Sequence, residues 1–401
     1  MKNLKTINVT LRVRLISNFF QLIITTAFLP FTALYLNEMV NAKFSGIFLS
    51  ILIILNIPIN LLGGQIIDSF PKRKTVITYQ VILVISLFFM AISLIENLNN
   101  IFLFCLTYAI FSVIWGLQFP AMSAIVMDAI TPDVENIVYK IDYWLGNTAT
   151  ALGLFFGSYL YNINKSMILF IATVIFFFTL LAFCKWLPKV SNEHSNNKLS
   201  DIHRSYYLVI KDRSYLLLIA SFCLLLSAEF STSSYVALRL QEQFNKVSIL
   251  GISITGVKMF SILMVVNTIV VITFSYPVMK INNVLKTNQV LLIGLFIYIF
   301  GYVNITYLNF IFPLIIAMII AAIGEILIFP IIQEKRYKLT PQDSRGVYSA
   351  IGDVGFSFAE LIGRIGIVLG TLLNKYEMSV YMLIILLTGA IGLYFSFYKK
   401  K

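Results

Sequence analysis

Long apolar stretches alternate with short polar breaks along almost the whole 401-residue chain. A helix needs about 20 mostly apolar residues to cross a bilayer, because each residue adds only about 1.5 Å of length. Backbone polar groups find no water partner in lipid, so each such stretch is expected to be a helix. Twelve spans are predicted, at residues 15–37, 44–66, 76–95, 101–125, 139–161, 166–187, 214–237, 250–276, 288–307, 311–332, 347–372 and 377–397.

The longest polar break divides these spans into six and six. It contains the run SNEHSNNKLSDIHRS, which is rich in charged and turn-forming residues. We therefore predict an N-terminal six-helix bundle at 1–187, a linker at 188–213 and a C-terminal six-helix bundle at 214–401. Two repeated half-bundles of this kind enclose a central cavity in many transport proteins.

The distribution of basic residues predicts the orientation. If the N-terminus is cytoplasmic, the cytoplasmic segments hold 23 Lys and Arg residues and the outer loops hold five. Basic residues accumulate on the cytoplasmic side of membrane proteins. Both termini and the central linker are therefore expected in the cytoplasm, and the net charge of +12 is explained without a nucleic-acid partner.

Composition and motifs argue against several other classes. With 59% hydrophobic and only 12% charged residues, the chain has too little polar surface for a soluble fold. The three cysteines lie singly in apolar runs, and the two histidines lie in the central polar break. No metal-ligand cluster, P-loop or nucleophile elbow is present in the sequence, so we expect no enzyme, no cofactor and no metal site.

The loop between spans two and three has the sequence GQIIDSFPKRK and resembles the signature loop of the major facilitator superfamily, G-x-L-x-D-R-x-G-R-[KR]. Ser69 and Pro71 depart from this pattern, where Arg and Gly are usual. The resemblance implies a twelve-helix fold of two halves and a gating role for this loop, together with Asp128 at the end of span four. The matching positions are Gly64, Ile66, Asp68, Lys72 and Arg73.

A closer resemblance is to the LmrP-type multidrug/proton antiporters. It rests on MDAITPDVENIVYKIDYWLGNTATALG, which contains Asp142, and on GEILIFP, which contains Glu325. The resemblance implies a monomeric multi-pass protein of a bacterial-type plasma membrane. Such a protein exports hydrophobic, often cationic, small molecules in exchange for protons by alternating access. The chain departs from related antiporters in that span four has no arginine and Leu154 follows Gly153 where Pro is usual.

Five acids lie within the predicted spans, where an unpaired charge costs several kcal/mol. We expect Asp142 and Glu325 to carry protons and to meet the substrate. Glu325 has no cation within a turn of it in sequence. Asp142 lies near the cytoplasmic end of span five, where a partly dry cavity favours a protonated carboxyl group, and where an acid can also cap the start of a helix. Glu229, which precedes the polar run Ser231 to Ser234, fits a proton site and a hydrogen-bonded structural acid equally well. The remaining two acids are Asp353 and Glu360.

Span eleven places Asp353, Glu360 and Arg364 on one helix face, because their spacings are seven and four. Glu360 and Arg364 are expected to form an ion pair, and Asp353 is the first candidate partner for the basic loop at Lys72 and Arg73. Lys258, in span eight, either extends to the membrane interface or pairs with Glu229.

The aromatic residues Trp115, Tyr143 and Trp144 are candidates for lining a cavity, although any single ring faces lipid just as readily. Two other transport functions stay open. The first is a dedicated exporter of one metabolite, such as a metallophore or lipid-like compound, whose anionic group binds Arg364 and Lys258. The second is a nutrient symporter.

Overall fold

The computed structural model describes residues 8–69, 71–95, 98–161, 163–188, 209–249, 252–281, 286–341 and 345–398. Within these ranges, the side chains of residues 60–69 and of several positions in 119–144, 275–281 and 345–350 are not described. The elements are α1 (Val9–Phe28), the 3-10 turn η2 (Leu29–Phe31), α2 (Thr32–Met39), α3 (Ala42–Ser69), α4 (Lys72–Ser93), α5 (Ile101–Ala129), α6 (Pro132–Tyr161), α7 (Lys165–Trp186), α9 (Arg213–Ser231), the π-helical turn η3 (Thr232–Val236), α10 (Ala237–Gln243), β1 (Val247–Ile249), β2 (Ile252–Ile254), α11 (Gly256–Ile281), α12 (Thr287–Tyr307), α13 (Ile311–Leu339), α14 (Arg345–Gly370) and α15 (Lys375–Tyr398).

Ten helical segments of the described chain are long and apolar enough to cross a membrane. Two long helices, α6 and α14, are not among these ten, and both carry charged residues along their length. Phe102, Phe296 and Phe312 expose 73%, 72% and 72% of their surface. Large apolar rings with this exposure are suited to contact with lipid rather than water.

The first predicted span is one helical segment interrupted by a proline. Pro30 lies in η2, between the end of α1 and the start of α2. Proline has no backbone N–H and its ring collides with the preceding turn, so it interrupts an α-helix. The chain therefore changes from α-helical to 3-10 geometry for three residues before it continues.

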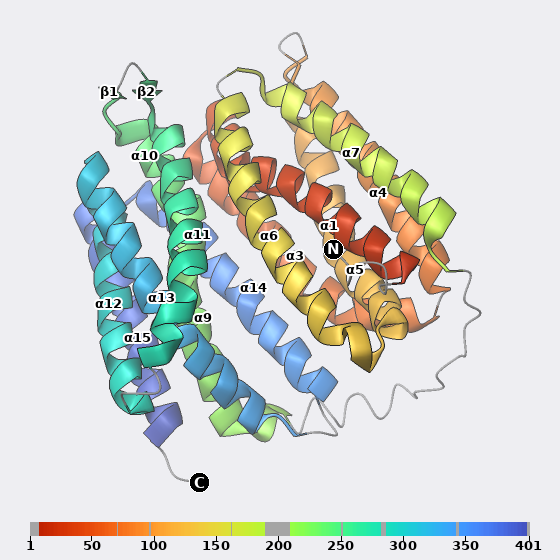
Figure 1. The fold of residues 1–401 in the computed structure, drawn as a ribbon. Coiled ribbons are helices and arrows are strands. Elements are labelled where there is room, and N and C mark those ends of the chain that lie inside the picture. Colours follow the sequence, from red (N-terminus) through yellow and green to blue (C-terminus); the bar gives the residue numbers. More distant parts are fainter. Residues whose placement is uncertain are drawn as a thin grey trace. The chain divides into compact units, whose positions relative to one another are not determined.

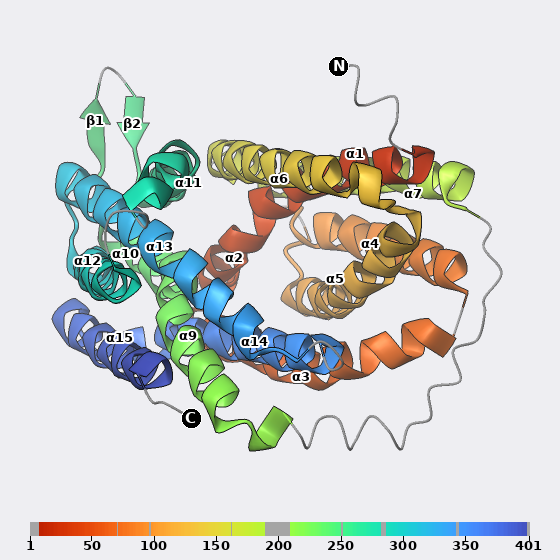
Figure 2. The ribbon, with the colours of Figure 1, turned by 60° about the horizontal axis from the view of Figure 1, so that its bottom comes forward.

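The predicted start of span eight at residue 250 is wrong. The chain forms an antiparallel hairpin of β1 and β2 there, and α11 begins only at Gly256 (Figure 2). Ile252 and Ile254 alternate with Ser253 in β2. This two-residue alternation with β-branched side chains favours a strand over a helix.

The contacts divide the chain into two compact units, unit 1 (residues 1–32 and 54–196) and unit 2 (residues 33–53 and 197–401). Residues 33–53, which hold nearly all of α2 and the first part of α3, precede most of unit 1 in sequence but group with the second unit. The spacing of the apolar runs did not predict this grouping, because the spacing contains no information on which helices contact each other.

In unit 1, α1 packs along α6 and α7, while α4 packs along α5 and α7 (Figure 1). Glycines explain the close approach of α6 to α1. A Cβ atom at Gly153 would overlap the backbone oxygen of Ile23, and one at Gly157 would overlap that of Ala27. Small residues at such a crossing allow two helix backbones to pack directly against each other.

In unit 2, the most extensive helix contact joins α12 to α13. Three glycines lie at this contact. Gly301 faces the backbone of Ala321, Gly324 faces the backbone of Tyr298, and Gly294 faces the side chains of Leu327 and Ile328. The side chain of Tyr298 is completely buried. The position of α13, and therefore of Glu325 beside Gly324, depends on this close packing.

Gly301→Ala tests this dependence. The new Cβ atom would lie 2.5–2.6 Å from three atoms of Ala321, so the helices must separate. Overpacking of this kind costs about 1–3 kcal/mol, and we expect a lower midpoint of thermal unfolding in detergent. Gly146→Ala is the matched control, because the nearest atom there is 3.9 Å away. Equal midpoints for the two variants would show that the α12–α13 contact is not constrained.

Candidate functional site

Two acids from different helices meet inside unit 2. The carboxyl group of Glu229 on α9 is within hydrogen-bonding contact of that of Glu325 on α13. Two carboxyl groups form a hydrogen bond only when one of them holds a proton, because carboxylates have no donor. Both side chains are partly buried, and Oε1 of Glu229 is fully buried without a partner in the described chain.

Neutral polar groups surround this carboxyl pair. Asn267 Nδ2 on α11 donates to Glu325 Oε2 over 3.2 Å. Tyr298 and Tyr302 on α12 lie within electrostatic reach of both acids, and their ring centroids are 4.6 Å apart. Tyr298 also donates its hydroxyl hydrogen to the backbone oxygen of Leu225 over 2.9 Å, which fixes its ring.

The Glu229–Glu325 pair needs a positive charge that its neutral neighbours do not supply. Asn267, Tyr298 and Tyr302 offer hydrogen-bonding dipoles but no positive charge. Two ionised carboxylates in contact repel each other, and partial burial weakens the screening by water. The arrangement is therefore stable when it holds a proton or when a cation binds between the acids.

The π-helical turn η3 begins at Thr232, three residues after Glu229. In η3, Ser234 donates its hydroxyl hydrogen to the backbone oxygen of Gly363 over 2.7 Å and so joins α9 to α14. Single π-helical turns within α-helices occur frequently at functional sites. The polar run that the sequence shows after Glu229 is thus a helix-joining segment as well as a neighbour of the acid pair.

Asp142 lies in unit 1 and has different neighbours. Asn18 Nδ2 on α1 donates to Asp142 Oδ1 over 3.2 Å. Arg14, one turn earlier on α1, interacts electrostatically with the same carboxylate. The first span was predicted to begin at residue 15. Because α1 begins at Val9, Arg14 lies inside the helix.

Of the three aromatic residues predicted to line a cavity, the structure describes the side chain of Trp115. Trp115 packs between Phe111 and Phe176, with ring centroids 5.9 and 5.7 Å away. The side chains of Tyr143 and Trp144 lie outside the described part of the structure, although their backbones belong to α6.

The charged residues of α14 have partners within unit 2. Arg364 Nη2 lies 3.3 Å from Glu360 Oε1, as expected from their spacing. Arg364 is 8% exposed, and its Nη1 has no partner among the described atoms. Asp353 is exposed and interacts electrostatically with Arg336 at the end of α13. The predicted link from Asp353 to the basic loop stays a prediction.

Lys258 is the third residue of α11, because the hairpin replaces the first part of the helix predicted from residue 250. Its Nζ donates to the backbone oxygen of Ser253 over 2.9 Å. The ammonium group therefore anchors β2 to the start of the helix.

The gating residues are only partly described. Gly64 and Asp68 lie in α3 and Asp128 lies in α5, but their side chains are outside the described part. Lys72 opens α4, and Arg73 Nη2 donates to the backbone oxygen of Cys184 over 2.5 Å. Cys184 is in the last turn of α7, where carbonyl groups without helical partners favour a cation.

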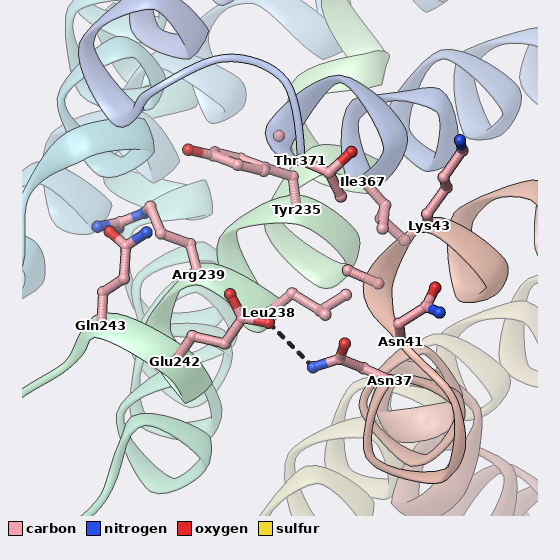
Figure 3. Close-up of a pocket in the computed structure, with 12 residues that line it drawn as sticks. Asn37, Asn41, Lys43, Tyr235, Leu238, Arg239, Glu242, Gln243, Ile367 and Thr371 are labelled. Atoms are coloured by element: carbon pink, nitrogen blue, oxygen red, sulfur yellow. Dashed lines mark hydrogen bonds between the residues drawn. The ribbon is translucent and has the colours of Figure 1, made fainter.

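A pocket of about 570 Å³ opens between helix ends of unit 2 (Figure 3). Asn37 on α2 donates to Glu242 Oε1 on α10 over 3.1 Å, and Gln241 donates to Glu38 over 2.6 Å. These two reciprocal amide–carboxylate bonds connect α2 to α10. They explain why residues 33–53 group with the second unit.

Arg239 lies in the wall of this pocket (Figure 3) and is only 2% exposed. Its Nη2 donates to the backbone oxygens of Ile305 and Leu308 over 3.1 and 2.8 Å, and its Nη1 bonds Asn309 Oδ1. These acceptors lie at the C-terminal end of α12. The guanidinium therefore caps that helix, as a cation at a helix C-terminus does.

Sequence reasoning missed the groups that complete each acid site. Asn267 stands alone in the apolar run of α11, and an isolated amide in such a run is a usable signal. Asn18 and Tyr298 had no such signal, because polar and aromatic residues recur throughout the spans. Only the helix packing shows that they face an acid.

Arg239→Met tests the capping role. It removes all donors from the carbonyl groups at the end of α12 and leaves them unsatisfied, at a cost on the order of 3 kcal/mol. We expect a clear drop in the thermal midpoint. Lys43→Met, which removes an exposed cation from the same pocket, is expected to leave the midpoint unchanged. Equal effects of the two substitutions would contradict the capping role.

Comparisons with known proteins agree with this architecture. A family model described as the Major Facilitator Superfamily matches residues 14–364. The chain is 23% identical over 383 residues to a protein of Planococcus maritimus named Na(+), Li(+), K(+)/H(+) antiporter, with 90% of this chain and 89% of that protein covered.

Solved structures of transporters share the fold. A peptide transporter POT in complex with sulfate superposes with a TM-score of 0.72 at 15% identity and covers 96% of this chain and 94% of its own. The nucleoside transporter NupG superposes with a TM-score of 0.73 at 14% identity, covering 98% and 100%. These likenesses concern the fold alone. The chain is therefore a multi-pass membrane transporter that belongs to the Major Facilitator Superfamily.

Proposed function

We propose that this transporter exchanges protons for monovalent cations and that the Glu229–Glu325 pair is the site where the two compete. The contact between the two carboxyl groups is the observation that carries the proposal. Neutral dipoles from Asn267 and the two tyrosines orient the pair without neutralising it.

Competition at one site gives exchange directly. A cation that binds between the carboxylates replaces the proton, and a proton that returns displaces the cation. Each ligand stabilises the conformation in which it binds best, and alternating access then carries the two in opposite directions. The cation and the proton therefore never need to occupy the pair together.

The cargo proposed first is a hydrophobic organic cation, in line with the LmrP-type resemblance. Aromatic rings beside the pair support it, because Tyr298 lies 4.6 Å from Tyr302 and 6.1 Å from Phe329 between ring centroids. Aromatic faces attract organic cations. The second cargo is an alkali cation. It is supported by the oxygen-rich ligands of the pair and by the name of the Planococcus maritimus relative.

A nutrient symporter stays an alternative, and so does a dedicated metabolite exporter. The exporter would use Arg364 to bind an anionic group, and the unpartnered Nη1 of this buried residue supports it. Glu360 already neutralises part of that charge, which weakens the case for an anion.

The membrane topology proposed with this function has twelve spans and cytoplasmic termini. Helices α6 and α14, of 30 and 26 residues, are long enough to add two spans to the ten apolar segments. We keep the division into two six-helix bundles (1–187 and 214–401) joined by the linker 188–213. The proposed state is a monomer in a bacterial-type plasma membrane. The proposed cytoplasmic gate comprises Gly64, Asp68, Lys72, Arg73 and Asp128.

Glu325→Gln and Glu229→Gln test the exchange site in proteoliposomes with an imposed pH gradient. Each amide keeps the shape of the side chain but cannot take up a proton, and we expect cation-dependent proton flux to fall by about tenfold or more. Glu377→Gln, an exposed acid at the start of α15, is the matched control and is expected to transport normally. If Glu325→Gln transports as well as the parent protein, its proton role is wrong.

The same vesicles decide the cargo. Proton release on addition of ethidium, but not of Na⁺, Li⁺ or K⁺, would identify a drug/proton antiporter, and the reverse result would identify an alkali cation antiporter. A response to neither, with normal incorporation of the protein, would leave the metabolite exporter and the nutrient symporter.

A further inference from the structure

A small cavity of about 40 Å³ lies inside unit 1. We call it the Arg14 cavity. Its apolar lining comes from Trp115, Met122 and Phe183, and its polar lining from Arg14, Asn18, Gln21 and Gln118. A single water needs roughly 10–15 Å³ of such space, so the cavity has room for a few water molecules.

A buried network of three glutamines borders the Arg14 cavity. Gln80 Oε1 accepts hydrogen bonds from Gln21 over 3.1 Å and from Gln118 over 2.6 Å, and Gln80 Nε2 donates to the backbone oxygen of Phe176. All three glutamines are at most 5% exposed. Both lone-pair positions of Gln80 Oε1 are therefore in use.

One acceptor in this network has no partner. Gln118 Oε1 is buried and lacks a hydrogen bond within the described residues, although Gln118 lines the cavity. A buried carbonyl oxygen without a donor is costly, and ordered water commonly supplies the missing bond. The neighbouring guanidinium of Arg14 repels an alkali cation, so water is the occupant that fits both groups.

Asn18 links the Arg14 cavity to Asp142. Asn18 lines the cavity and donates to Asp142 Oδ1 over 3.2 Å, and Arg14, which also lines the cavity, interacts electrostatically with the same carboxylate. Helix α7, which also packs against α6, carries Lys165 and Lys185, and their ammonium groups lie over the rings of Tyr161 and Trp186. Among the described side chains, Arg14 is a cation that interacts electrostatically with Asp142.

We propose that the Arg14 cavity binds water that bridges Gln118 and Arg14, and that this water brings protons to Asp142, with Arg14 as the positioning residue that balances its charge. The binding of water depends only on the cavity. The delivery of protons to Asp142 rests on the proposed function of the protein as a proton-coupled antiporter. The two parts are therefore tested separately.

Radiolytic hydroxyl labelling of the intact protein in nanodiscs tests the bound water. Hydroxyl radicals formed from a trapped water oxidise the side chains beside it, even buried ones. We expect oxidation of Met122 and Phe183, which are 3% and 1% exposed, but not of Met90 and Phe104, which are equally buried away from the cavity lining. Equal labelling of the two sets, or none at either, would overturn the water site.

Two substitutions of Gln118 sharpen this experiment. Gln118→Met removes the acceptor at similar volume and is expected to abolish the label on Phe183. Gln118→Glu keeps an acceptor oxygen and is expected to retain it. If Gln118→Met does not fold, the comparison within the parent protein decides alone. Undiminished labelling in a folded Gln118→Met protein would contradict the bridging role of Gln118.

Transport in proteoliposomes tests the link to Asp142. We expect Arg14→Gln to reduce proton-coupled flux about tenfold and to give the same pH profile as Asp142→Asn, with no further loss in the double variant, because the two groups act as one unit. Arg12→Gln, two residues away and exposed, is the matched control. Additive losses, or a parental pH profile for Arg14→Gln, would reject the positioning role. If the labelling experiment detects bound water but the transport assay shows no coupling between Arg14 and Asp142, the water has a structural role and does not deliver protons.

Discussion

The cost of placing a negative charge where water screens it poorly is the constraint on which the rest of this structure depends. The contact between Glu229 and Glu325 is its clearest expression, because two carboxylates meet where only neutral dipoles face them. Such a pair is stable only with a proton or a bound cation. A transporter that must release one ligand to bind another needs a site with this property.

Each unit contains one acid site, and the two sites are balanced differently. In unit 2 the acids have Asn267 and two tyrosines, so the missing charge has to come from a ligand. In unit 1 Asp142 has a resident cation, Arg14, and a hydrogen bond from Asn18. A cation within the protein stabilises the charged form of an acid. An acid pair without such a cation is stabilised by a bound proton or a bound cation. The two sites therefore differ in where their balancing positive charge comes from.

Other cations of the described chain are committed to the fold. Arg239 caps α12, Arg73 reaches the last turn of α7, and Lys258 holds the hairpin to α11. Each one binds backbone oxygens near an element end, where carbonyl groups lack regular partners. These contacts hold the ends of helices and of the hairpin in place within each unit.

The sequence by itself determined the class and most of the apolar helices, because a membrane helix is defined by a local run of about 20 apolar residues. It also predicted the Glu360–Arg364 pair, which depends only on spacing along one helix. The tertiary structure alone decided that Glu229 meets Glu325, 96 residues away, and that Arg14 faces Asp142. It likewise decided that residues 33–53 group with the second unit and that the chain before Gly256 is a hairpin. Those outcomes depend on which helix faces meet, and the repeated apolar pattern of each span leaves that choice open.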